Sequence, residues 1–165
     1  MNRLKLAFVS FGFLGCSPFA PGTAGTLGGV LLAWILSSSE HYLAWTAAAC
    51  GVLYAASLPL GRWAEGYAGR KDPGIFVVDE VIGYLVTVAW TRGPSLLALA
   101  LAFFVFRFFD IVKPPPARAA ERIPGGHGIL LDDVVAGVWG LAAVMLPARL
   151  LLDGLPWTVA APGGP

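Results

Sequence analysis

The chain has 165 residues, of which 57% are hydrophobic and only 13% are charged, and its mean hydropathy is +0.73. Soluble domains carry about 25% charged residues, so the composition predicts an integral membrane protein. The net charge of +1 and the lack of a clustered basic face exclude nucleic acid as a partner, and the length suits one membrane-embedded domain, residues 1–152.

The sequence predicts an all-α fold, an integral membrane bundle of four to five short transmembrane helices preceded by an N-terminal re-entrant or interfacial segment. That first segment, residues 4–15, is apolar but too short to span and contains two glycines. Further apolar helices are expected at residues 27–36, 42–60, 75–91, 96–112 and 132–152. The tail, residues 153–165, is rich in Gly and Pro and is predicted to be disordered.

The segment CSPFAPGTAGTLGG, residues 16–29, is expected to interrupt regular structure because of its prolines and glycines. Thr23 and Thr26 place hydroxyl groups beside the backbone N–H groups of permissive residues. Such a loop could bind an anionic group at the start of the following helix. Spacing alone favours a plain re-entrant turn, because no lysine follows where a Walker loop requires one.

Lysine and arginine are concentrated in two predicted loops, residues 61–74 and 113–131. Two spans separate these loops, so both lie on the same side of the membrane, and the positive-inside rule makes that side cytoplasmic. The acids near them then lie within about two helical turns of the cytoplasmic helix ends or in the connecting loop. These acids are Asp72, Asp79, Glu80, Asp110, Asp132 and Asp133. We therefore expect acids from separate segments to form one cluster.

Small residues lie beneath two of these acids. Residues three and four apart share a helix face, so Asp133 aligns with Gly137 and Glu80 aligns with Gly83. Small residues allow neighbouring helices to approach closely. Three helices can then direct their carboxylates into one pocket.

Several carboxylates at close range repel one another, so such a cluster either binds cations or relays protons. Oxygen ligands select a hard cation, Mg²⁺ or Mn²⁺, over Zn²⁺. Arg107 and Lys113 flank Asp110 three residues away on either side, as a phosphate clamp beside a metal-binding acid would. Membrane anchoring with a local ion pair explains each of the two cations equally well. His127 alone is interpreted as a hydrogen-bonding loop residue.

Four sequence blocks carry a resemblance to a known family. They are SPFAPGTAGTLGG, KDPGIFVVDEVIG, FRFFDIVKPPP and GGHGILLDDVVAG. Together they resemble the bacterial phosphatidylglycerophosphatase A family, membrane enzymes that remove the terminal phosphate of phosphatidylglycerophosphate to give phosphatidylglycerol. The order and spacing of the blocks over residues 15–140 make the resemblance specific, whereas any one block alone would be weak.

The resemblance implies a Mg²⁺-dependent phosphomonoesterase, a multi-pass protein of the bacterial cytoplasmic membrane whose active site faces the cytoplasm and whose substrate is a membrane phospholipid. The expected metal ligands are Asp72, Asp79, Glu80, Asp132 and Asp133. The expected catalytic residues are Asp110, Asp132, Asp133 and Lys113, with Asp110 either a further ligand or the general base. The expected substrate-binding residues are Thr23, Thr26, Arg107, Lys113 and His127.

The sequence leaves the mechanism open. It contains no CxxxxxR phosphate loop and no DxDxT nucleophile motif, so water activated by the metal is the preferred nucleophile. An aspartyl-phosphate formed on Asp132 or Asp133 is the alternative. A cation or proton conduit would also explain acids in apolar segments, but it needs them at graded depths. Small-residue helix faces permit a homodimer and do not demand one.

Overall fold

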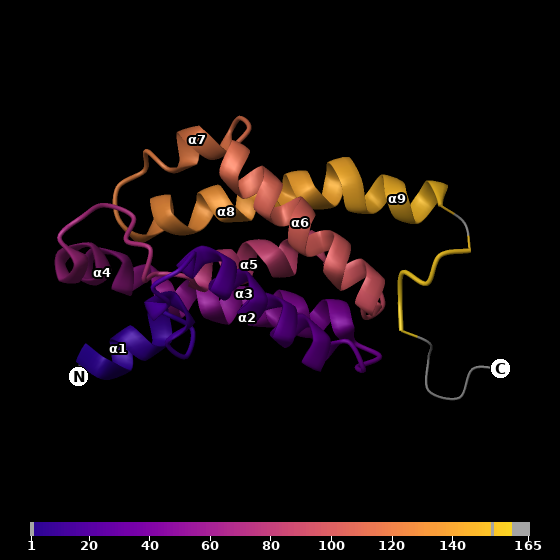
Figure 1. Ribbon diagram of the computed structural model, residues 1–165, viewed down its shortest axis with the longest axis horizontal. Coiled ribbons are helices and arrows are strands. Elements are labelled where there is room, and N and C mark those ends of the chain that lie inside the picture. The colour runs from indigo at the N-terminus through magenta and orange to yellow at the C-terminus, as the bar shows by residue number, and fades with distance from the viewer. Residues whose placement is uncertain (1, 153, 160–165) are drawn as a thin grey trace.

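Helices form the framework of the computed structural model, which describes residues 2–152 and 154–159 (Figure 1). They are α1 (Asn2–Val9), α2 (Pro21–Leu36), α3 (Tyr42–Ser57), α4 (Gly61–Ala68), α5 (Val78–Thr87), α6 (Leu96–Val112), α7 (Ala117–Ala120), α8 (Gly126–Gly140) and α9 (Leu146–Leu151). Short 3-10 turns occupy Leu14–Cys16 and Leu58–Leu60, and a π-helical turn occupies Leu141–Met145. Over the described residues there is no strand, and an isolated β-bridge joins Pro94 to Thr158. The prediction of an all-α fold is confirmed.

Two continuous helical runs are long and apolar enough to cross a membrane. Tyr42–Ala68 combines α3, a 3-10 turn and α4 over 27 residues, and Gly126–Leu151 joins α8 to α9 over 26 residues. Only 11% of the most apolar stretch of the first run is buried, unlike the core helix of a soluble protein. The span predicted at 75–91 is wrong in its bounds, because α5 has 10 residues, too short for a hydrocarbon core of about 30 Å. The predicted count of four to five spans is not confirmed.

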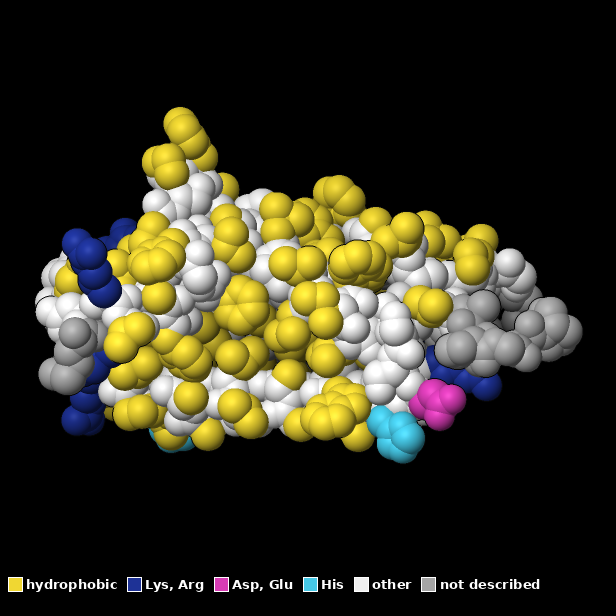
Figure 2. All heavy atoms as spheres, turned by 90° about the horizontal axis from the view of Figure 1, so that it is seen from below, with side chains coloured by type: hydrophobic (Ala, Val, Ile, Leu, Met, Phe, Trp, Pro, Cys, Tyr) yellow, Lys and Arg dark blue, Asp and Glu magenta, His cyan; other side chains and the backbone are white. Residues whose placement is uncertain are grey.

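Large apolar side chains cover the outside of the bundle. Val52 on α3 and Phe104 on α6 are 67% and 69% exposed, and Trp45 and Phe108 are exposed on the same two helices. Figure 2 shows hydrophobic side chains over the middle of one face, with charged side chains gathered toward its two ends. An apolar surface of this extent is unfavourable in water and suits contact with lipid. It supports the association of the chain with a membrane.

Two helical runs extend beyond their predicted ranges at glycines, one past Gly61 and the other from Gly126. The run continues past Pro59, which lies at the start of the short 3-10 turn between α3 and α4. Gly61 lies against the start of α8, and a Cβ on it would lie 2.5 Å from the Cα of Gly126. Helix α8 begins at Gly126, so the expected start at Asp132 is wrong. Both glycines allow close helix packing and do not end a helix.

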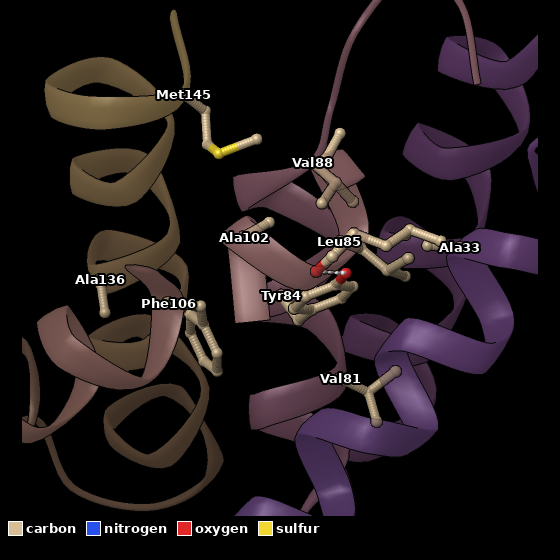
Figure 3. Packing of buried hydrophobic residues seen from close by; sticks show 11 residues of the cluster. Ala33, Val81, Tyr84, Leu85, Val88, Ala102, Phe106, Ala136 and Met145 are labelled. Carbon is tan, nitrogen blue, oxygen red and sulfur yellow. Dashed lines mark hydrogen bonds between the residues drawn. The ribbon is translucent and has the colours of Figure 1, made fainter. Parts of the chain in front are cut away.

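Helix α5 lies at the centre of the bundle and packs against α2, α3, α6 and α8. Val81, Tyr84 and Leu85 on this helix are fully buried. They belong to one core cluster with Phe106 of α6 and Ala136 of α8 (Figure 3). This core fixes the position of the first residues of α5 relative to α8.

Glycine allows α5 and α8 to approach each other at backbone distance. A Cβ on Gly83 would lie 2.6 Å from the carbonyl oxygen of Asp133, and a Cβ on Gly137 would overlap the carbonyl oxygen of Gly83. A larger residue does not fit at either position without moving a backbone. The prediction that small residues beneath the acids allow close helix approach is confirmed.

The described part of the C-terminal tail, residues 154–159, lies against the loop that precedes α6. The backbone N–H of Ser95 donates to the carbonyl of Trp157 over 3.1 Å. This part of the tail therefore has backbone partners. The disorder predicted for residues 153 and 160–165 falls outside the described residues, and the assignment of a single domain stays a prediction.

Candidate functional site

Three carboxylates from two helices meet inside the bundle. Asp79 and Glu80 lie in the first turn of α5, and Asp133 lies about two turns into α8. One carboxylate oxygen from each lies within 4.8 Å of the other two. The backbone N–H of Glu80 donates to Oδ1 of Asp79 over 3.0 Å, which fixes the two neighbours relative to each other. We call these three residues the acid cluster.

Further predicted acids surround the acid cluster. The charges of Asp110, in the last turn of α6, and of Asp132 act on the carboxylate of Asp133. The charge of Asp72, in the loop before α5, acts on Asp79. The predicted meeting of acids from separate segments is therefore shown for α5 and α8, and the wider cluster that includes Asp72, Asp110 and Asp132 stays a prediction.

Asp132 has a different environment from its neighbour Asp133. Its Oδ2 accepts a hydrogen bond from Nζ of Lys113 over 2.5 Å, and its Oδ1 accepts the backbone N–H of Asp133 over 3.0 Å. Burial lowers the pKa of Lys113, but the hydrogen bond and charge of Asp132 outweigh this effect and raise it. Because Asp132 is 4% exposed, Lys113 neutralises a buried charge there.

The start of α2 lies beside the acid cluster. Helix α2 begins at Pro21, so the expected re-entrant loop PGTAGT is wrong and these residues form the first helical turns. Proline suits this position because its missing N–H has no intrahelical partner to lose. A Cβ on Gly22 would lie 2.5 Å from Oε1 of Glu80 and 3.1 Å from Nη1 of Arg107. The segment thus lies beside the acid cluster.

The two threonines of this segment differ in their surroundings. Thr26 is fully buried, and its hydroxyl donates to the carbonyl of Gly22 over 2.9 Å. That hydroxyl is therefore engaged within its own helix. Thr23 is half-buried in the first turn, and its role in substrate binding stays a prediction.

Arg107 forms an ion pair with Asp110 one turn further along α6. Nη1 of Arg107 lies 2.5 Å from Oδ2 of Asp110, and their side chains are 21% and 14% exposed. This contact agrees with the local ion pair that was the alternative to a phosphate clamp for Arg107, whereas Lys113 pairs with Asp132 and not with Asp110. The same guanidinium also lies close to Gly22, which Glu80 contacts too, so this positive charge lies beside both the start of α2 and the acid cluster.

Asp72 lies in the loop between α4 and α5. Its φ is 46°, a left-handed conformation that aspartate adopts more readily than most residues. The residue as a whole is exposed, yet the atoms packed around its carboxyl group raise its pKa, an effect that the charge of Lys113 opposes. An exposed acid beside a buried cluster is accessible to water and to a substrate.

His127 lies in the first turn of α8 and is exposed. Its Nδ1 lies 2.8 Å from the hydroxyl of Tyr54 on α3. This contact agrees with its interpretation as a hydrogen-bonding residue, but the expected loop is wrong because the residue is helical. Its predicted role in substrate binding stays a prediction.

Sequence reasoning missed two residues that border the site. Gly22 showed no signal beyond its place in a glycine-rich segment. Glu121 lies with Oε1 3.8 Å from Nζ of Lys113, and its backbone carbonyl accepts from Nζ of Lys71 over 3.0 Å. No helical spacing relates Glu121 to Lys113, because the chain turns back through α7 between them.

The acid cluster fits a hard divalent cation. Oε2 of Glu80 is buried and has no hydrogen-bond partner among the described residues. A buried acceptor of this kind is costly unless a ligand satisfies it. The three side chains offer only oxygen atoms, the ligands that Mg²⁺ and Mn²⁺ prefer. Asp79, Glu80 and Asp133 could therefore hold a metal ion.

The chain is similar over most of its length to named bacterial proteins. The chain is 38% identical over 141 residues to a Bacteroides thetaiotaomicron protein named "Putative phosphatidylinositol-3-phosphatase", which covers 79% of this chain and 84% of the relative. It is 34% identical over 148 residues to the phosphatidylglycerophosphatase A of Haemophilus influenzae, with 87% and 88% covered. It is 35% identical over 146 residues to the phosphatidylglycerophosphatase A of Escherichia coli, with 83% and 78% covered.

No solved structure matches the chain significantly. The model of the phosphatidylglycerophosphatase A family matches residues 7–148, which include every acid of the site. The resemblance that the sequence blocks indicated is thereby confirmed. The chain therefore belongs to the phosphatidylglycerophosphatase A family and is a phosphatase that hydrolyses phosphoric monoesters.

Proposed function

We propose that the chain hydrolyses the terminal phosphomonoester of phosphatidylglycerophosphate to phosphatidylglycerol and phosphate, with Mg²⁺ as cofactor, in phospholipid biosynthesis. Membership of the family supports this reaction. The observation that carries the proposal is the acid cluster, in which three carboxylates from two helices lie within 4.8 Å of one another. Two cationic side chains, Arg107 and Lys113, border it.

In this proposal Asp79, Glu80 and Asp133 hold the metal ion. Bound Mg²⁺ supplies charge that offsets the phosphate oxygens and lowers the pKa of water. The unpartnered Oε2 of Glu80 supports this assignment. Asp72, at the exposed edge of the cluster, is a further candidate ligand.

The basic residues position the phosphate group. Arg107 donates to phosphate oxygens from α6, and its ion pair with Asp110 holds the guanidinium toward the start of α2. Lys113 donates a second positive charge, and Asp132 orients it through the 2.5 Å hydrogen bond. Each carboxylate oxygen of Asp132 already accepts a hydrogen bond, one from Lys113 and one from the backbone of Asp133, which favours this positioning role over a ligand role.

Water is the proposed nucleophile. It attacks phosphorus, the bond from phosphorus to the glycerol oxygen breaks, and that oxygen leaves and takes up a proton. Asp110, in the last turn of α6, is the proposed acceptor of the proton of the attacking water, and this proton balances the one that the leaving glycerol oxygen takes up. The engagement of both oxygens of Asp132 argues against an aspartyl-phosphate on that residue.

The proposed location is the bacterial cytoplasmic membrane, with a multi-pass chain and the acid cluster at the cytoplasmic headgroup level. The two apolar helical runs support membrane insertion. The two basic segments lie at one end of the bundle, since Lys71 bonds to the carbonyl of Glu121, and the positive-inside rule favours the cytoplasm for that end. A homodimer stays a prediction.

A second substrate is favoured by one comparison, because the name of the Bacteroides relative refers to a phosphoinositide monoester.

The experiment that tests the proposed function measures phosphate release by purified protein in mixed micelles. Its substrates are phosphatidylglycerophosphate, phosphatidic acid and phosphatidylinositol-3-phosphate, each with Mg²⁺ and with chelator. We expect Mg²⁺-dependent release that is fastest from phosphatidylglycerophosphate. If the protein released phosphate from none of the three lipids and carried ions across the membrane of reconstituted vesicles, the cation or proton conduit would replace this proposal.

A further inference from the structure

A cavity separate from the acid cluster opens at the basic end of the bundle. Its volume is about 460 Å³, within the range of small-ligand sites. It lies between the end of α4, the loop that follows it, and the segment joining α7 to α8. Its lining residues are Glu65, Gly69, Arg70, Lys71, Arg122, Pro124 and Gly125. We call it the basic cavity.

Positive charge dominates the basic cavity. Arg70, Lys71 and Arg122 contribute three cations, against the single carboxylate of Glu65. Among the described residues, none of these three cations lies within 4.0 Å of a carboxylate oxygen. The ion pairs in that part of the chain are formed by Arg107 and Lys113, which do not line the basic cavity. Guanidinium groups without a carboxylate partner bind phosphate oxygens well.

The backbone at the rim adds to this preference for anions. Gly125 stands at the N-terminus of α8, where no side chain caps the helix. The first N–H groups of a helix of this length favour negative charge near them. The helix end strengthens the attraction that the three cations already create.

The surroundings of the basic cavity favour a lipid over a free anion. Two apolar side chains neighbour lining residues in the sequence. Ile123, between Arg122 and Pro124, is 40% exposed, and Tyr67, two residues before Gly69, is 54% exposed. Trp63 stacks on Tyr67 at 5.2 Å, and Nζ of Lys5 lies 5.6 Å from the Trp63 ring. Aromatic side chains beside lysine and arginine are typical of the headgroup level of a membrane. The exposed Tyr67 and Ile123, which neighbour lining residues in the chain, can then contact acyl chains while the cations bind the headgroup.

The basic cavity is linked to the catalytic end without sharing its acids. Lys71 bonds to the carbonyl of Glu121, and the carboxylate of Glu121 lies 3.8 Å from Lys113. We propose that the basic cavity binds the phosphate headgroup of an anionic phospholipid as a second site, apart from the acid cluster. The inference rests on the proposed membrane function for the placement of this end at the headgroup level.

The test measures lipid binding without turnover. Purified protein in zwitterionic micelles is titrated with dioleoyl-phosphatidylglycerol, which has no phosphomonoester, and with phosphatidylcholine and inorganic phosphate, and bound ligand is counted by native mass spectrometry. We expect saturable binding of phosphatidylglycerol. The variant R70A/R122A should bind it at least about tenfold more weakly, because two charge-assisted contacts are lost. The control R3A/R92A removes the same charge from two exposed positions elsewhere and should bind as wild type does.

Two further variants keep the result interpretable. R70K/R122K retains the charge and should keep most of the binding, which separates a lost contact from a lost fold. Asp133→Asn should bind phosphatidylglycerol at the cavity even though it releases no phosphate, so failure of the proposed reaction leaves this result standing. Wild-type affinity in R70A/R122A would overturn the second site. Equal affinity for inorganic phosphate and phosphatidylglycerol would overturn its assignment to lipid.

Discussion

Gly22 in the first turn of α2 stands directly against Glu80 of the acid cluster. A Cβ at residue 22 would lie 2.5 Å from Oε1 of Glu80 and 3.1 Å from Nη1 of Arg107. The absence of a side chain at residue 22 therefore leaves the space that the carboxylate of Glu80 and the guanidinium of Arg107 occupy. This contact joins the glycine-rich segment to the catalytic chemistry.

Gly22→Ala should lower phosphatase activity without weakening the helix. Alanine favours a helix over glycine by roughly 1 kcal/mol, so a lower Tm is not expected. Glu80 or Arg107 must move, and a displacement of this kind should lower kcat/KM at least about tenfold. Gly51→Ala, on α3 with open space around its Cβ position, is the control and should retain full activity. Full activity in Gly22→Ala would show that this contact does not position the site.

Asp133→Asn should abolish phosphate release while the protein stays folded. The change preserves shape but removes one of the three charges expected to hold the metal, so we expect a loss of at least about 100-fold in kcat/KM. Without metal the fold should be as stable or more so, because repulsion within the acid cluster falls. Glu40→Gln, exposed, is the matched control. Wild-type turnover by Asp133→Asn would exclude this residue from the machinery.

The sequence predicted the acids better than the helices that carry them. The convergence followed from two basic segments and the count of elements between them, which depends only on topology. Helix bounds near Gly61 and Gly126 could not be predicted, because each glycine faces the other helix. A single sequence does not distinguish a glycine that ends a helix from one that permits close packing. The pairing of Lys113 with Asp132 could not be predicted either, because it depends on how the chain turns back through α7.

Metal binding should be visible in thermal stability. Mg²⁺ added to chelator-treated wild-type protein should raise its Tm, because the acid cluster exists only in the folded state. At a free concentration one hundred times Kd the gain is about 2.7 kcal/mol. Glu80→Gln and Asp133→Asn should reduce the increase sharply. Potassium chloride at matched ionic strength is the control, and an equal increase with that salt would mean that general screening is responsible.

Loss of Lys113 should destabilise the protein more than loss of Asp132. Lys113→Met leaves the 4% exposed carboxylate of Asp132 without its cation, whereas Asp132→Asn leaves a lysine that is 22% exposed and near Glu121. Removing one partner of a buried pair costs about 3–5 kcal/mol, and the more accessible partner suffers less. Denaturant unfolding of both single variants and the double variant measures the coupling. Equal losses of unfolding free energy in the two single variants would show that the cost does not depend on how deeply the remaining partner is buried.

Gly137→Ala should separate α5 from α8 and affect stability and activity together. A Cβ at this position overlaps the carbonyl oxygen of Gly83, and a backbone atom cannot move aside as a flexible side chain can. Overpacking of this kind costs about 1–3 kcal/mol, and the shift should also move Asp133 away from Glu80. Gly66→Ala in α4 has open space around its Cβ position and should gain up to about 1 kcal/mol from helix propensity. If Gly137→Ala gained stability as the control does, the close approach of the two helices would not be what holds the acid cluster together.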